Sequence, residues 1–228
     1  MKGEFYPRSI PAAKMLGYYA ERFPAVEINN TFYRMPSEEV LRQWAGSVPE
    51  GFVFAVKTPQ EITHRKRLKD VGEPAGAFFG ALGALGDRIG PVLVQLPPNQ
   101  KKDLARLAAF LELRPPGLRV AFEFRDESWF DDEVIGLLRA HGVALCIAHG
   151  EKVDAPILPT TDWGYLRLRK GDYNEAELVE WVNIVRRESP GWTDAFVFFM
   201  HEDTATGPKL ARRFADLYAG LADDRYTP

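Results

Sequence analysis

Charged and amide side chains stand where several buried, strand-like segments of this 228-residue sequence end. Glu27 and Asn29 are two residues apart, as are Glu123 and Arg125, so each pair shares one face of an extended segment. Further polar residues that end or interrupt such segments are Lys57, Gln95 and Arg167. Carboxylates in this position can act as general bases, and Lys and Arg bind phosphate or carboxylate groups. The pattern therefore predicts a site for a small anionic molecule.

Each of these residues has a candidate role that follows from its chemistry. The candidate catalytic residues are Glu27 and Glu123, as general base or metal ligands, and His64, as a proton carrier. The candidate substrate-binding residues are Asn29, Lys57, Gln95, Arg125, Trp129 and Arg167, with Lys57 and Arg167 holding the anion. His149 and His201 follow strand-like segments and are candidate ligands, with the carboxylates, of a divalent metal cofactor. Whether a metal binds is left open by the sequence.

The same charges could instead form a structural network inside the protein. A charge within a buried sheet must be paired, because an unpaired one costs several kcal/mol, and Glu27, Lys57, Glu123 and Arg167 can pair among themselves. We favour a ligand site because the charges stand at one end of the strands and not along them. With Arg125 included, the set carries an excess of one positive charge, which suits a small anion.

Two alternating sequence periods predict the elements that position these residues. Short apolar, β-branched or aromatic runs, typical of strands covered on both faces, occur at residues 25–29, 52–57, 92–96, 119–124, 143–148, 165–168 and 195–200. Segments with helical spacing lie between them, one of which opens with a capping box at Asn174 and Glu177. This alternation predicts a TIM-like βα barrel as a single domain over residues 1–228. Active sites of such barrels lie at the C-terminal ends of the strands, where the polar residues fall.

The predicted barrel lacks one strand. Only seven strands are readable, and the pattern begins with a loop and a helix where a βα barrel begins with a strand. The usual first strand is therefore expected to be missing at the N-terminus. We expect the strand around Val26 to have no strand partner on the side facing the strand around Val197. Two such open edges would also allow self-association through their unpaired N–H and C=O groups.

Composition narrows the classes of protein to be considered. Lys and Arg number 29 against 32 Asp and Glu, and the resulting net charge of −3 disfavours nucleic acid as a partner. No run approaches the 18 or so apolar residues of a membrane-spanning helix, which argues against a membrane protein. Cys146 is the single cysteine, so an intramolecular disulfide is excluded. With no apolar run typical of a signal peptide at its start, the chain is expected in a reduced, cytoplasmic compartment.

Several stretches, in order along the chain, resemble the YecE-like family, a group of barrel proteins known as a domain of unknown function. They are residues 26–33, 54–59, 62–64, 91–98, 122–125, 128–129 and 165–168. The resemblance covers nearly the whole chain and implies a TIM-like βα barrel, but no established reaction. Relatives often carry Phe-Asn-Asn at the last strand, where this chain reads Phe199, Met200 and His201. Any role of those asparagines therefore does not transfer to this chain.

Two functions from different classes are consistent with these observations. The first is an enzyme, of hydrolase or phosphodiesterase type by analogy of fold alone, acting on a phosphorylated or carboxylated substrate at the C-terminal ends of the strands. The second is a non-catalytic barrel that binds a metabolite or a partner, in which the charged residues are mainly structural. A ligand that stabilises the protein is expected in both cases, and turnover of that ligand only in the first.

Overall fold

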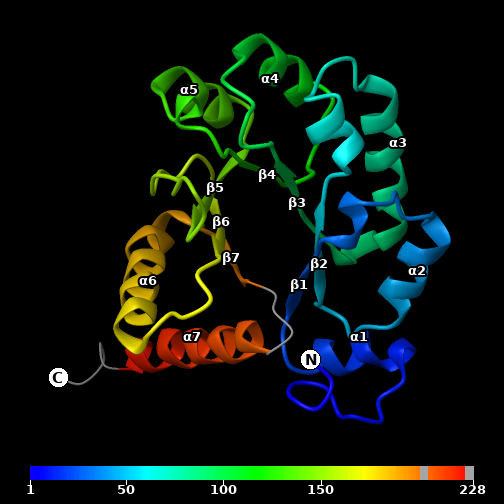
Figure 1. Cartoon of the computed structure of the whole chain (residues 1–228), viewed down its shortest axis with the longest axis vertical. Helices are drawn as coiled ribbons and strands as arrows, with labels where there is room; N and C mark the ends of the chain where they lie inside the picture. The colour runs from blue at the N-terminus through cyan, green and yellow to red at the C-terminus, as the bar shows by residue number, and fades with distance from the viewer. Residues whose placement is uncertain (201–204, 224–228) are drawn as a thin grey trace.

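Seven parallel strands form a curved sheet in a computed structural model that describes residues 1–200 and 205–223 (Figure 1). The strands are β1 (Ala25–Ile28), β2 (Val53–Lys57), β3 (Ile89–Gln95), β4 (Val120–Glu123), β5 (Ala144–His149), β6 (Trp163–Leu168) and β7 (Asp194–Phe199). Each strand pairs in parallel with the next strand along the chain. The TIM-like barrel with seven readable strands is thereby confirmed.

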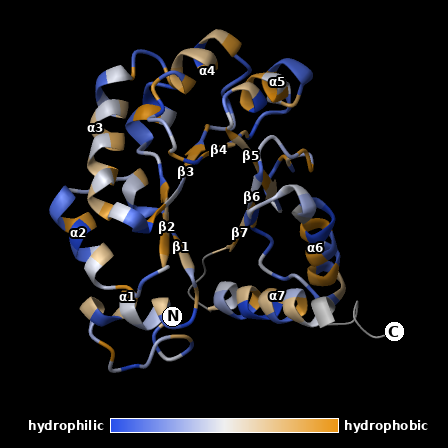
Figure 2. Cartoon of the chain, turned by 180° about the vertical axis from the view of Figure 1, so that it is seen from behind, coloured by the Kyte–Doolittle hydropathy of each residue, from blue (hydrophilic) through white to orange (hydrophobic). Residues whose placement is uncertain are grey.

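The strands are apolar on both sides because the sheet is covered on both sides (Figure 2). Side chains alternate across a strand, so one set faces the barrel interior and the other faces the helices. Ala55, Leu93 and Cys146 belong to the interior set, which forms a small cluster of its own. Phe54 and Phe122 belong to the outer set and pack in the large core beneath the helices. Lys57, Gln95, Glu123 and Arg167, each at or next to the C-terminal end of its strand, are buried polar residues of the sheet.

Helices surround the strands, and α2, α4 and α5 begin at the side-chain caps Ser37, Asp103 and Asp131. The helices are α1 (Ala12–Ala20), α2 (Glu38–Gly46), α3 (Gly72–Leu82), α4 (Leu104–Leu111), α5 (Asp132–Ala140), α6 (Glu175–Glu188) and α7 (Thr206–Asp223). Short helical turns are η1 (Asn30–Phe32), η2 (Glu61–Arg65), η3 (Gly83–Arg88), η4 (Glu127–Trp129) and η5 (Ser189–Gly191). The capping box before α6 is confirmed, since Asn174 N–H donates to Glu177 at 2.8 Å and Glu177 N–H donates back at 3.0 Å. None of the helices in the described part of the chain is long and apolar enough to cross a membrane.

The sheet does not close into a complete ring. Among the residues that the structure describes, β1 and β7 are the two ends of the strand order and share no ladder of hydrogen bonds. The first residues do not fill this gap as a strand, because Lys2 bridges to Tyr6 within their own segment. The expectation that the Val26 strand has no partner toward the Val197 strand is confirmed. Self-association through these edges stays a prediction.

Candidate functional site

A network of two carboxylates around one guanidinium fills the interior at the C-terminal ends of the strands. Arg167 on β6 donates from Nε and Nη2 to the two oxygens of Glu27 on β1, at 3.0 and 2.9 Å. Its Nη1 donates to Glu123 on β4 at 2.5 Å. All three side chains are buried, with exposed fractions of 2%, 7% and 0% for Arg167, Glu27 and Glu123. We call these three residues the Glu–Arg–Glu network.

The network keeps its charges because each member is compensated. Burial alone would raise the pKa of Glu27, but the charge of the Arg167 guanidinium and hydrogen bonds from Tyr165, Arg167 and Asn29 outweigh burial and hold that pKa below its usual value. Two of those hydrogen bonds come from Tyr165, whose hydroxyl donates at 2.7 Å, and from the Asn29 amide at 2.9 Å. Burial would likewise lower the pKa of Arg167, yet the carboxylates of Glu27 and Glu123 raise it well above its usual value. Glu27 and Arg167 are therefore both ionised at neutral pH.

Lys57 lies beside this network without joining it as an ion pair. Its ammonium donates to Gln95 Oε1 at 2.8 Å, and the Gln95 amide donates in turn to Glu123 at 2.7 Å. The ammonium also lies 4.4 Å from the centre of the Phe32 ring, within the range of a cation–π contact. Among the described residues, no carboxylate lies within the 4.0 Å of a salt bridge. Of the four residues in the structural network that the sequence offered as an alternative, Arg167 forms ion pairs with Glu27 and Glu123. Lys57 is linked to Glu123 only through Gln95.

The surroundings of Lys57 disfavour its charged form. Burial is the main cause, and the Arg167 guanidinium adds to it, whereas the carboxylates of Glu123 and Glu27 oppose the change only in part. The pKa of Lys57 is lowered as a result from 10.5 to about 8. A lysine of this kind carries a measurable fraction of neutral amine near neutral pH.

A second charged cluster stands beside the network at the end of the barrel. Arg125 donates to Glu151 Oε2 at 3.0 Å, and Arg169 Nε lies 2.7 Å from Glu151 Oε1. All three side chains are partly exposed. Two guanidiniums therefore share one carboxylate in a place that solvent and a ligand can reach.

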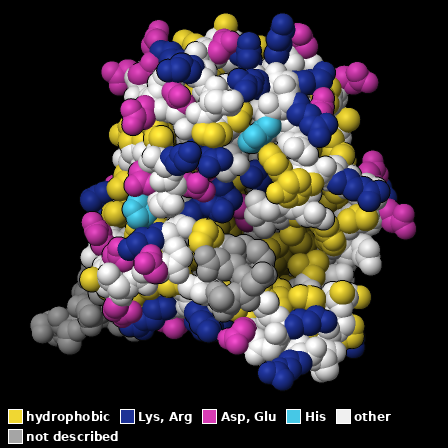
Figure 3. Space-filling model, viewed as in Figure 1, with side chains coloured by type: hydrophobic (Ala, Val, Ile, Leu, Met, Phe, Trp, Pro, Cys, Tyr) yellow, Lys and Arg dark blue, Asp and Glu magenta, His cyan; other side chains and the backbone are white. Residues whose placement is uncertain are grey.

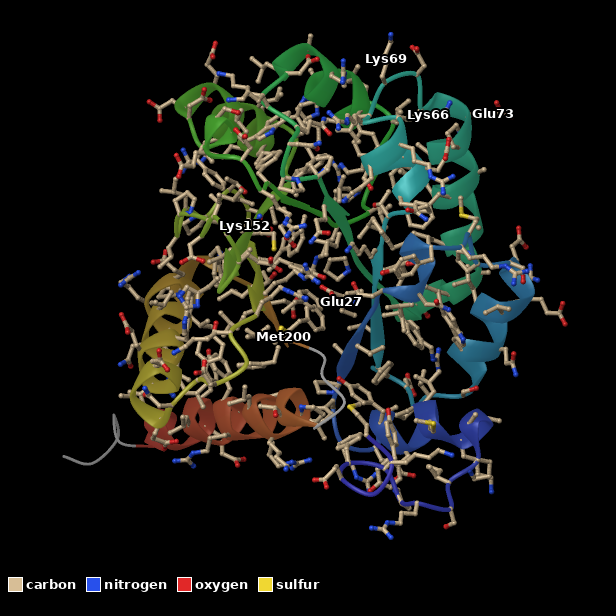
Figure 4. The ribbon with its side chains drawn as sticks, in the orientation of Figure 1. Glu27, Lys66, Lys69, Glu73, Lys152 and Met200 are labelled. Carbon is tan, nitrogen blue, oxygen red and sulfur yellow. The ribbon has the colours of Figure 1, made fainter. Side chains whose placement is uncertain are left out.

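An open cavity of about 1560 Å³ connects these groups with the gap between β1 and β7. Its polar end is lined by Glu27, Lys57 and Arg167 and by the second charged cluster (Arg125, Glu151 and Arg169). Its apolar part is lined by α1, α7 and the facing edges of β1 and β7. Figure 3 shows a hollow with largely hydrophobic walls on this face, and Lys and Arg side chains beside the hollow, near the middle of the face. Glu27 of β1 and Met200, which follows β7, both lie near the barrel centre (Figure 4). We call the polar end of this cavity the barrel mouth.

The structure brings most of the predicted site residues to the barrel mouth. Glu27, Asn29, Lys57, Gln95, Glu123 and Arg167 form one chain of hydrogen bonds there. Arg125 lines the same cavity. Their roles as catalytic or binding residues stay predictions.

Two other candidates lie elsewhere, each for a physical reason. Trp129 is fully buried under the helices, stacked on Phe124 with its indole N–H bonded to a backbone carbonyl, so assigning it to substrate binding is wrong. His149 points outward, packs on Trp181 and shares a 2.7 Å hydrogen bond with the Tyr173 hydroxyl. It therefore cannot join the carboxylates inside the barrel. His201 lies outside the described residues.

His64 is near the mouth but does not line the cavity. Its ring meets the Phe32 ring edge-on at 4.8 Å and its Nδ1 is 2.9 Å from the Thr63 hydroxyl. Burial, then Lys57 and two arginines, lower the pKa of His64 to about 4. The imidazole is thus neutral at neutral pH, and a role as a proton donor in its cationic form is disfavoured.

The arrangement favours binding over proton transfer by the carboxylates. A general base must be free to take a proton, whereas Glu27 and Glu123 each receive a hydrogen bond from the Arg167 guanidinium. Within residues 1–200 and 205–223, no three His, Cys, Asp or Glu side chains are grouped as metal ligands. A divalent metal therefore has no ligand set among the described residues, and the hydrolase hypothesis gains nothing from the geometry.

Four residues of the mouth were missed by sequence reasoning. Tyr165 and Arg169 are two residues before and after Arg167, so the two-residue period of a strand places them on its face. That signal was present in the sequence. Glu151 and Phe32 lie in segments that follow strands, and no residue spacing in the sequence predicts that they line the mouth.

Comparison with known proteins agrees with the fold and the motifs. The family model described as "Protein of unknown function DUF72" matches residues 1–226. UPF0759 protein YunF of Bacillus subtilis is 24% identical over 95% of this chain and 92% of its own length. UPF0759 protein YecE of Escherichia coli K12 is 31% identical, over 49% of this chain and 42% of its own.

Solved structures give the same result. The crystal structure of a DUF72 family protein from Thermotoga maritima superposes with a TM-score of 0.81 at 27% identity, covering 97% of this chain and 94% of that one. The family match over almost the entire chain and the shared barrel carry the assignment. This chain belongs to the DUF72 family, the YecE-like barrels that its sequence motifs resemble.

Proposed function

We propose that the barrel mouth binds a small molecule carrying a phosphate or carboxylate group. The observation that carries this proposal is the charge balance of the mouth in the described residues. Four cations, Lys57, Arg125, Arg167 and Arg169, face only three carboxylates, Glu27, Glu123 and Glu151. A partly buried excess of one positive charge is stabilised by an anion from solution.

The cations divide into two kinds. Arg167 is buried and donates three hydrogen bonds to two carboxylates, so it holds the mouth in shape. Lys57 donates to a neutral amide, and Arg125 and Arg169 share one carboxylate, so these three have donors left for a ligand. The anion is accordingly expected among Lys57, Arg125 and Arg169, and the Glu–Arg–Glu network is the fixed wall behind it.

Glycerol 3-phosphate and inorganic phosphate should raise the melting temperature, whereas glycerol should not. At ten times the dissociation constant, one bound anion adds about 1.4 kcal/mol, which corresponds to about 3–6 °C for a protein of this size. The ligand-induced shift, measured by differential scanning fluorimetry, should vanish in the double variant Arg125→Gln/Lys57→Met. Arg42→Gln, which removes an exposed cation on α2, is the matched control and should keep the shift. Equal shifts in the double variant and the parent would contradict the proposal.

A further inference from the structure

The amine of Lys57 has surroundings that suit a nucleophile better than a structural cation. Its one hydrogen-bond partner in the described residues is Gln95 Oε1, a neutral acceptor held in place because the Gln95 amide donates to Glu123. One side of the amine is covered by the Phe32 ring at 4.4 Å. The residue itself is nine-tenths buried, yet it lines the open cavity. A small molecule in the barrel mouth can therefore meet the amine directly.

Charge in the neighbourhood supports the neutral form of this amine. The facing groups are Glu27, Glu123, Arg167, Arg169 and His64, from β1, β4, β6, the segment after β6, and η2. The two carboxylates are ion-paired with Arg167, so they oppose the effect of burial on Lys57 only in part. With a pKa lowered to about 8, on the order of a tenth of the amine is unprotonated at pH 7, against less than a thousandth for an ordinary lysine.

The mouth also offers an anchor for the rest of such a substrate. Arg125 and Arg169 line the same cavity as Lys57 and share the single carboxylate of Glu151. A phosphate or carboxylate bound by these guanidiniums would hold a carbonyl group beside the amine. Positioning of this kind converts a slow encounter into an intramolecular reaction.

We propose that Lys57 forms a Schiff base with the aldehyde or ketone group of a small anionic substrate, an inference that rests on the proposed anion site for its substrate class. The neutral amine adds to the carbonyl carbon, forming a C–N bond, while a proton passes from nitrogen to the former carbonyl oxygen. The resulting carbinolamine loses its hydroxyl group with a proton as one molecule of water, leaving a C=N bond to Lys57. Protonated, this imine withdraws electrons from the adjacent carbon, so the substrate can lose a proton or break a bond there. No oxidant, reductant or cofactor is required.

Reductive trapping tests this step. The full chain is incubated at pH 8 with sodium cyanoborohydride and either dihydroxyacetone phosphate or pyruvate, and the modified peptide is identified by mass spectrometry. Cyanoborohydride reduces the C=N bond to a stable secondary amine. We expect one of these two probes to label Lys57 at least tenfold faster than any exposed lysine, and the uncharged probe dihydroxyacetone to label it at least tenfold more slowly. Which of the two probes reacts distinguishes a phosphate from a carboxylate substrate.

Two variants provide the controls. Lys57→Arg keeps a cation in the mouth but removes the nucleophile, so the adduct should be lost while phosphate still raises the melting temperature. Lys66→Arg, which changes an exposed lysine, should leave the labelling of Lys57 unchanged. Labelling spread evenly over exposed lysines, or none at Lys57 in a protein that phosphate does stabilise, would overturn the Schiff base and leave the anion site standing. Fast labelling of Lys57 by dihydroxyacetone with no stabilisation by phosphate would overturn the anion site and retain the nucleophile.

Discussion

Replacing Arg167 by methionine is expected to lower the free energy of unfolding by about 3–5 kcal/mol. The substitution leaves Glu27 and Glu123 buried with no counter-ion, and an uncompensated buried charge is costly. Because a domain is stable by only about 5–15 kcal/mol, the variant is expected to be marginal. Urea unfolding followed by tryptophan fluorescence measures the effect. Arg42→Gln, which breaks an exposed pair with Glu38, should cost no more than about 1 kcal/mol.

A triple variant keeps this prediction testable if the single variant fails to fold. Arg167→Met combined with Glu27→Gln and Glu123→Gln removes all three charges of the Glu–Arg–Glu network at once. Replacement of a whole buried ion network is often neutral, so the triple variant should recover at least half of the lost stability. A single variant as stable as the parent, or a triple variant no better than the single one, would contradict the structural role of the network.

Lys57→Met is expected to change how the free energy of unfolding depends on pH. We expect a smaller effect on the value of that free energy at neutral pH. In the parent, the folded-state pKa of Lys57 is about 8, below the value of the unfolded chain. Between about pH 8 and 10.5 the unfolded state therefore binds more protons at Lys57, and this residue contributes a rise in stability with pH. The variant lacks this rise. Its free energy of unfolding relative to the parent should fall by about 2 kcal/mol between pH 7 and pH 10.

At pH 7 itself two effects of Lys57→Met oppose each other. The variant escapes the cost of burying a charge, but it leaves Gln95 Oε1 without its donor, which costs about 1–3 kcal/mol. The comparison across pH removes that constant cost. A difference between variant and parent that stays level from pH 7 to pH 10 would show that the surroundings do not disfavour the charged lysine.

The strands and the polar ends of the strands were predictable because both depend on local patterns. A strand covered on both faces must be apolar throughout, so charged residues are expected only where the strand ends. Side-chain alternation also predicts which way the residues at the strand ends point. Cys146 points inward, so His149, three residues later, must point outward toward the helices. The same alternation places Tyr165 next to Arg167 on the inner face.

The choice of ion-pair partners was not predictable in the same way. Glu27 and Arg167 are 140 residues apart and meet only because the sheet curves until β1 and β6 face one another. Because of that curvature, Arg167 pairs with the carboxylates of both Glu27 and Glu123, and Lys57 donates to the neutral amide of Gln95. The burial of Trp129 was not predictable from the sequence either, because the short turn η4 brings this side chain back into the core beside Phe124.

The ionisation of Lys57 shows whether the barrel mouth holds a buried lysine without a carboxylate partner among the described residues. The protein is labelled with carbon-13 at the ε-carbon of lysine, and the Lys57 signal is assigned from its absence in Lys57→Arg. Its chemical shift is then followed from pH 6 to pH 11. We expect a midpoint near pH 8. A midpoint at pH 10 or above would contradict this expectation, because the amine would then be paired with a carboxylate or fully hydrated.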